Sequence, residues 1–197
     1  MRYNKKIIDE IRKGQENMII EKETINLNGK ELVLRSATEA DAEMLINYLK
    51  TICGETRFLI KEPEEISLTV EKEIEIIYRN NEAERGAMIL GFLDGEYVGN
   101  CSLNAYGQSR YRHRASVGIA LFQKFNGMGI GTAMMEKLIS LGKESGFEQL
   151  ELEVVAGNER ALHLYQKMGF EVYGTLPNNM KYKDGTYADC YFMMKKL

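Results

Sequence analysis

The chain has 197 residues, of which 44% are hydrophobic and 28% charged, and its formal net charge is −3. This length favours one domain with a substantial core. The negative charge argues against a nucleic-acid-binding protein that depends on general attraction to phosphates. Three widely spaced cysteines without metal-ligand spacing indicate reduced thiols, a cytoplasmic location and no metal site. No apolar run approaches the length of a membrane span, so no membrane partner is expected.

Residues 1–28 are predicted to be an N-terminal extension of a domain at 29–197. Apolar residues within 7–11 suggest a short amphipathic helix, and the run at 18–20 suggests a strand. The expected role of this extension is packing, either against the core or against a neighbouring subunit. A turn then leads into a strand at 32–35.

Two helices are predicted next. Thr38 and Asp41 resemble a capping box at the start of the first helix. Pro63 is predicted to open the second helix, whose buried stripe would be Ile66, Val70, Ile74 and Ile77. Four acidic residues in this region form either a solvated surface or one that attracts a cationic amine: Glu55, Glu62, Glu64 and Glu65.

Residues 88–93 and 97–103 alternate as strands around the hairpin dipeptide Asp94-Gly95. The segment 110–114 is predicted to be extended, which would place its three arginines on one face. That face is either a charged sheet edge or a row that meets phosphates or an acidic substrate. His113 in this segment is either a proton acceptor or a structural histidine.

The most informative stretch joins a strand, a glycine-rich turn and a helix. Residues 116–122 form a short apolar run with β-branched members, which is typical of a buried strand. Gly127, Gly129 and Gly131 follow, and an apolar face at helical spacing begins at Ile130. Glycines let a ligand approach the backbone closely, and the unpaired amides of a helix's first turn attract phosphate. The stretch therefore predicts a phosphate site, with a tight connection that binds nothing as the alternative.

The glycine spacing differs from two other phosphate-binding patterns. The third glycine comes without the two-residue gap of the dinucleotide motif, and no Gly-Lys-Ser/Thr follows as in a Walker loop. Further along, Gln149–Val155 alternates as a strand, and Asn158 is a suitable N-cap for a helix that Gly169 ends. Two last strands are predicted on either side of a turn at Asp184-Gly185.

These motifs resemble the GNAT superfamily of acyl-CoA-dependent N-acyltransferases. The family's loop, Arg/Gln-x-x-Gly-x-Gly/Ala, is matched by residues 126–131 except that Asn126 occupies the first position. The family's later signature is an Asn, an Ala three residues on, a Tyr seven residues on and a Gly-Phe pair. It is matched by Asn158, Ala161, Tyr165, Gly169 and Phe170.

The resemblance implies an α/β (α+β) single-domain fold, with a mixed, mostly antiparallel sheet flanked by helices. It also implies acetyl-CoA as co-substrate and no metal. The pantetheine arm would pair with the backbone of Ile119, Ala120 and Leu121, where two strands splay apart. The pyrophosphate would rest on backbone amides of Asn126, Gly127, Met128, Gly129, Ile130, Gly131 and Thr132. Asn158 would cap its helix, contact the cofactor, or do both.

The implied activity is N-acetyl transfer to a primary amine by direct attack, with Tyr165 protonating the departing CoA thiolate. Many relatives use a glutamate as general base, but the aligned position holds Ser116, which leaves Glu151, Glu153, His113 or a water chain. The acceptor is either a small-molecule amine or a protein amine. A catalytically inactive acyl-CoA sensor and a protein that binds another phosphate-bearing ligand are the alternatives. Homodimers are common in the family, and the resemblance leaves a homodimer open here.

Overall fold

Eight strands of the described chain form one mixed sheet, in the order β1-β2-β3-β4-β5-β6-β8-β7. The computed structural model describes residues 18–197, so the helix predicted within 7–11 lies outside the described part. Neighbouring strands are antiparallel except β5 and β6, which run parallel. The strands are β1 (Glu23–Leu27), β2 (Lys30–Ser36), β3 (Ala87–Leu93), β4 (Glu96–Ala105), β5 (Arg114–Leu121), β6 (Gln149–Val155), β7 (Glu171–Lys181) and β8 (Tyr187–Lys196).

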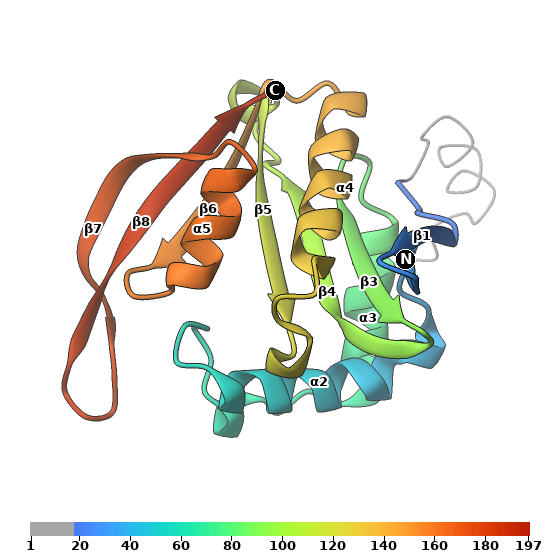
Figure 1. Ribbon diagram of the computed structural model, residues 1–197, viewed down its shortest axis with the longest axis horizontal. Helices are drawn as coiled ribbons and strands as arrows, with labels where there is room; N and C mark the ends of the chain where they lie inside the picture. The colour runs from blue at the N-terminus through green and yellow to red at the C-terminus, as the bar shows by residue number, and fades with distance from the viewer. Residues whose placement is uncertain (1–17) are drawn as a thin grey trace, which may run out of the picture.

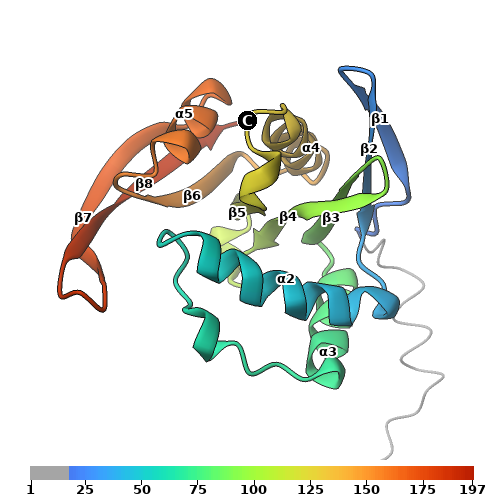
Figure 2. The ribbon, with the colours of Figure 1, turned by 60° about the horizontal axis from the view of Figure 1, so that its bottom comes forward.

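Helices cover both faces of this sheet (Figures 1 and 2). On one face, the α2/α3 face, lie α2 (Ala42–Glu55) and α3 (Val70–Asn81). On the other, the α4/α5 face, lie α4 (Ile130–Glu144) and α5 (Glu159–Lys167). The predicted class, a single α/β domain with a mixed sheet between helices, is confirmed.

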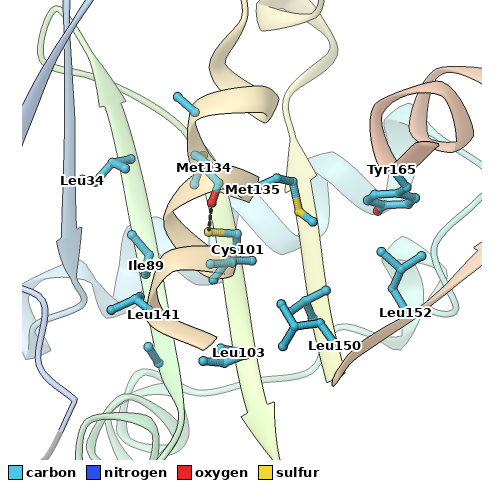
Figure 3. Packing of buried hydrophobic residues seen from close by; sticks show 14 of the residues in the cluster. Leu34, Ile89, Cys101, Leu103, Met134, Met135, Leu141, Leu150, Leu152 and Tyr165 are labelled. Carbon is cyan, nitrogen blue, oxygen red and sulfur yellow. Dashed lines mark hydrogen bonds between the residues drawn. The ribbon is translucent and has the colours of Figure 1, made fainter. Parts of the chain in front are cut away.

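The main core lies between the sheet and α4. Met134 and Met135 of α4 are fully buried and belong to one cluster with Leu34, Ile89 and Leu103 from three strands (Figure 3). Complete burial of an apolar side chain of this size contributes about 1.5–3 kcal/mol. The cluster therefore fixes α4, and with it the glycine-rich turn that precedes this helix.

The predicted capping box of Thr38 and Asp41, directly before α2, is confirmed. The backbone amide of Thr38 donates to Asp41 Oδ2 at 2.7 Å, and Arg35 donates to both carboxylate oxygens at 2.7 Å each. Burial alone would raise the pKa of Asp41, but the hydrogen bonds from Arg35 and Thr38 hold it below its usual value. A charged carboxylate thus joins β2 to the start of α2.

The second helix begins later than the sequence predicts. Pro63–Glu65 forms only a 3₁₀ turn, and α3 starts at Val70. Thr69 caps α3, because its side-chain oxygen accepts a hydrogen bond from the Lys72 amide at 3.3 Å. The predicted buried stripe is therefore wrong at Val70, which is 41% exposed. Ile66 is buried as predicted, but from the connecting segment and not from the helix.

The prediction of an extended segment at 110–114 is also wrong. Ser109–Tyr111 is a 3₁₀ turn, and β5 begins only at Arg114. Gly107 and Ser109 favour such a turn locally. As a result the three arginines do not share one strand face. Arg112 makes an exposed ion pair, whereas Arg114 binds a buried carboxylate in the sheet.

The described part of the N-terminal extension joins the sheet. Its only strand within the described residues is β1. The strand predicted at 18–20 is wrong, because these residues have no regular secondary structure. Met18 and Ile20 nevertheless pack against the main core. Within residues 18–197, no helix is both long and apolar enough to cross a membrane.

Candidate functional site

The centre of the sheet is interrupted between β5 and β6. β5 pairs with β4 along most of its length, from Ala115 to Leu121. With β6 it pairs only at residues 114–116, and the last register pair is Ser116 with Glu151. Beyond this pair, which we call the fork, the two strands diverge (Figure 1).

The divergence leaves one edge of β5 open. The Ala120 carbonyl accepts a hydrogen bond from the Tyr48 hydroxyl at 2.6 Å, and the Phe122 amide donates to a β4 carbonyl at 3.0 Å. Backbone groups of successive strand residues point to alternate edges, so those of Ile119 and Leu121 face the open edge. Of the three residues predicted to pair with pantetheine, these two keep their backbone groups available, while the Ala120 carbonyl is occupied.

β5 leads into a turn with a left-handed backbone at two glycines. Gly127 and Gly129 have φ of +79° and +84°, a region in which a Cβ is disfavoured. The Asn126 amide is used inside the turn, where it donates to the Gln123 carbonyl at 3.0 Å. The loop amides that remain open to a ligand therefore begin after Asn126.

The first turn of α4 is suited to an anion. Ala133 is the first helix residue whose amide reaches a carbonyl one turn earlier, that of Gly129, at 3.1 Å. The amides of residues 130–132 precede it and have no such partner. The first turn carries no acidic side chain, and the helix dipole is positive there. At Gly131 a Cβ would lie 3.2 Å from the Leu164 side chain, so glycine lets α5 approach this turn.

Asn158 and Tyr165 lie on α5 as the sequence predicts. Asn158 Oδ1 accepts a hydrogen bond from the Ala161 amide at 3.3 Å. The Tyr165 ring is buried and lies beside Leu152 of β6 on the α4/α5 face (Figure 3). Burial raises the pKa of Tyr165 to about 12, so the phenol keeps its proton at neutral pH. Among residues 18–197, no hydrogen bond engages its hydroxyl.

On the α2/α3 face, the fork carries a buried ion pair. Glu151 is buried and accepts hydrogen bonds from Arg114 at 2.8 Å, Gln149 at 2.7 Å and Tyr106 at 3.2 Å. The hydrogen bond to Glu151 raises the pKa of Arg114, so the guanidinium stays charged. Glu151 was one candidate for the general base, but here it is neutralised by Arg114.

Glu153 lies two residues further along β6, beyond the fork and on the same face as Glu151. Its side chain is exposed. Its carboxylate meets the Cys190 thiol at 3.9 Å and has no basic partner within residues 18–197. His113 is also exposed, but it precedes β5 at the closed end of the strand pair, where its carbonyl binds the amides of 148 and 149.

The segment after α2 reaches across to the tip of the β7–β8 hairpin. The Arg57 guanidinium lies 3.6 Å from the centre of the Tyr182 ring and donates to Thr186 Oγ1 at 3.2 Å. All four acidic residues of this region have internal partners. Glu62 and Glu64 bind Lys183, Glu65 binds the Glu62 amide, and Glu55 binds the Gln123 amide. These contacts do not support a surface of free carboxylates that attracts an amine.

The mixed sheet between helices, with its forked parallel strand pair, is an acetyltransferase type of fold. The chain belongs to the acetyltransferase (GNAT) family, whose model matches residues 49–170. The resemblance inferred from the sequence is confirmed.

Similar proteins include L-amino acid N-acetyltransferase AaaT of Escherichia coli, 29% identical over 110 residues. The match covers 54% of this chain and 66% of AaaT, just under two thirds of that protein. A GNAT-family acetyltransferase from Streptococcus pneumoniae has a similar structure, with a TM-score of 0.80 and 29% identity over 85% of this chain and 100% of that one. The yncA protein of Salmonella typhimurium, solved with its cofactor acetyl-CoA, shares the fold with a TM-score of 0.73 and 16% identity, over 84% of this chain and 94% of that one.

Sequence reasoning missed two features of β4 and α2 that shape the site. Tyr48 lies within the first predicted helix, but no local pattern indicates the partner of its hydroxyl. Gly99 has φ of +139°, and a Cβ there would lie 2.2 Å from the Ala120 carbonyl oxygen. The register of β4 also shifts next to it, between Gly99 and Tyr97. A glycine inside a strand pattern is a signal for such a bulge.

Gly99→Ala is expected to destabilise the protein by about 1–3 kcal/mol, because the new methyl group overlaps backbone that cannot rotate away. Urea denaturation measures the change. Gly118→Ala is the matched control, since its Cβ would come no closer than 3.7 Å to another atom. Equal stability of the two variants would show that the close approach at Gly99 is not a constraint.

Proposed function

We propose that this protein is an N-acetyltransferase that moves the acetyl group of acetyl-CoA to a primary amine. The observation that carries the proposal is the fork, because it joins three requirements of that reaction. It leaves strand amides open for an extended ligand, it leads into a helix start that attracts phosphate, and it has Tyr165 on one face.

The proposed cofactor contacts follow the open backbone. The pantetheine arm carries amides, so it can pair with Ile119 and Leu121 as an added strand would. The pyrophosphate would bind the amides of residues 127–132 at the start of α4. Acetyl-CoA bound to yncA, which shares the fold, supports this choice of ligand. Asn158 caps α5 and is proposed to contact the cofactor from there.

Tyr165 is proposed as the acid that protonates the CoA sulfur. The amine nitrogen attacks the thioester carbon, the C–S bond breaks, and the sulfur takes the phenolic proton. The nitrogen, now part of the amide, loses one proton to solvent, and solvent returns a proton to the phenolate. Burial disfavours the charged form of any group. A thiolate released into the surroundings that raise the pKa of Tyr165 to about 12 is therefore also a stronger base than in water. The apolar setting therefore raises the proton affinity of donor and acceptor together.

Glu153 is proposed as the group that accepts the proton from the incoming ammonium, directly or through a water. A Lys-like amine has a pKa of ~10 and must lose a proton before it attacks. Glu153 is exposed and has no basic partner within the described residues, while Glu151 is held by Arg114. The acceptor would thus enter on the α2/α3 face, opposite Tyr165. Both a small-molecule amine and a protein amine fit this proposal.

The three cysteines are free and buried. We propose a cytoplasmic location on this basis, since the cytoplasm keeps thiols reduced.

Calorimetric titration with acetyl-CoA tests the proposal directly, with NAD and ATP as control ligands. Selective binding of acetyl-CoA is expected. Thr132→Glu should weaken that binding at least tenfold, because its carboxylate would stand at the phosphate site. The same change should not lower thermal stability, since an acidic residue favours a helix N-terminus. Thr132→Gln, of similar size and no charge, should bind more tightly than Thr132→Glu.

Absence of acetyl-CoA binding by the folded wild type would refute the proposal. Binding without CoA release in the presence of a broad amine panel would favour the acyl-CoA sensor. Binding of ATP or NAD in preference would favour a different phosphate-bearing ligand.

Tyr165→Phe should lower kcat by about 10²–10⁴-fold, the usual range for a positioned acid, with little change in the Kd for acetyl-CoA. Because the pKa of Tyr165 is about 12, the phenol is protonated throughout pH 6–9. The ratio of wild-type to variant kcat should therefore be constant across that range. Steady-state kinetics measure it, and an unchanged kcat would remove Tyr165 from the mechanism.

Glu153→Gln should lower kcat/KM for the amine most strongly at low pH. The loss should shrink as the pH approaches the amine's own pKa, because the free amine then needs no proton acceptor. Glu171→Gln, on the exposed edge strand β7, is the matched control and should behave as wild type. A loss that does not vary with pH would assign Glu153 a structural role.

A further inference from the structure

The Tyr48 hydroxyl lies between two strands of the sheet. Tyr48 belongs to α2 and is 3% exposed. Its hydroxyl donates to the Ala120 carbonyl at 2.6 Å and also lies next to the Asn100 backbone. Asn100 and Ala120 are opposite each other in the register of β4 and β5. A side chain of a helix thus lies beside a backbone pair of the sheet.

In a regular antiparallel ladder, two such residues exchange their hydrogen bonds directly. A hydroxyl placed beside such a pair can supply a hydrogen bond to one of its backbone groups. The neighbouring backbone of β4 is irregular, because Gly99 has φ of +139° and the register of β4 against β3 shifts beside it. The Tyr48 hydroxyl thus satisfies the Ala120 carbonyl next to this irregular backbone.

The Tyr48 ring is fixed in place by aromatic neighbours. Its centroid lies 5.2 Å from that of Tyr97 and 5.0 Å from that of Phe122, and both contacts are edge-on. This is a favourable arrangement for aromatic pairs. Burial raises the pKa of Tyr48 far above its usual value, so the hydroxyl always has its proton to donate.

α2 holds the end of β5 at a second point. The Glu55 carboxylate accepts a hydrogen bond from the Gln123 amide at 2.8 Å, and the Gln123 side chain donates to the Glu55 carbonyl. These contacts and the Tyr48 contact lie on either side of Leu121. One helix thus sets the position of the strand end that leads into the glycine loop.

We propose that Tyr48 is a positioning residue for the cofactor strand. Its hydroxyl, supported by Glu55, holds the end of β5 so that Ile119 and Leu121 present their backbone groups to the pantetheine arm. This inference rests on the proposed function, since it assumes that acetyl-CoA binds along β5. It adds that α2, which packs on the opposite face from α4, determines the affinity for the cofactor.

Tyr48→Phe tests the proposal. It should raise both the Kd and the KM for acetyl-CoA about tenfold while kcat changes less than about twofold, because the strand end relaxes but Tyr165 and Glu153 stay in place. Tyr97→Phe is the matched control. It belongs to the same aromatic cluster and also loses one hydroxyl contact, at 3.0 Å from the Asn100 side chain, but that contact does not reach β5. Its Kd for acetyl-CoA should equal that of wild type.

Glu55→Ala provides a second variant that does not disturb the core, since Glu55 is only half-buried. It should raise the Kd for acetyl-CoA about threefold or more, whereas Glu43→Ala at the exposed start of α2 should not.

The proposal is overturned if Tyr48→Phe and Tyr97→Phe bind acetyl-CoA with the same Kd, or if Tyr48→Phe lowers kcat and leaves KM unchanged. If Tyr48→Phe does not fold, wild-type affinity of Glu55→Ala overturns it. Failure of the wild type to bind acetyl-CoA would instead refute the proposed function itself.

Discussion

The structure of the site depends on one constraint, the early end of hydrogen bonding between β5 and β6. A strand in the middle of a sheet normally satisfies both edges, because an unpaired backbone group removed from water is costly. Here β5 keeps its partner on the β4 side and loses it on the other after Ser116. Residues 118–121 are half-buried, whereas Ala115 and Val117 are buried. Water or an extended ligand with amides of its own can satisfy the open edge.

The fork also separates two chemical environments. On the α4/α5 face, Tyr165 is surrounded by apolar side chains that favour its neutral form. On the α2/α3 face, Glu153 is exposed to solvent, and water stabilises charged groups in general. Acetyl transfer requires a proton to leave the amine and another to reach the sulfur. Groups whose surroundings favour opposite charge states suit such a division of roles.

The elements with strong local signals were predictable from the sequence. The glycine turn, the start of α4 at Ile130 and the cap at Asn158 all depend on neighbours within a few residues, and all appear as expected. The errors came where tertiary contacts or competing turns decide. Pro63 opens only a 3₁₀ turn, whereas Thr69 caps a regular helix, so α3 begins later than predicted. The partners of Tyr48 and Glu151 are far away in the chain, at separations of 72 and 37 residues, and no local pattern encodes them.

The departure at Asn126 from the family's Arg or Gln has a physical explanation in the turn. The Asn126 amide closes the 3₁₀ turn of residues 123–125 through the Gln123 carbonyl, and Gln123 is in turn bound to Glu55 of α2. The loop is thus anchored from its first residues by α2, before the glycines begin. A long side chain at position 126 is not needed to hold a loop that is already fixed in this way. The proposed recognition of phosphate by the amides of 127–132 depends on backbone geometry, which the left-handed glycines and the burial of Ile130 preserve.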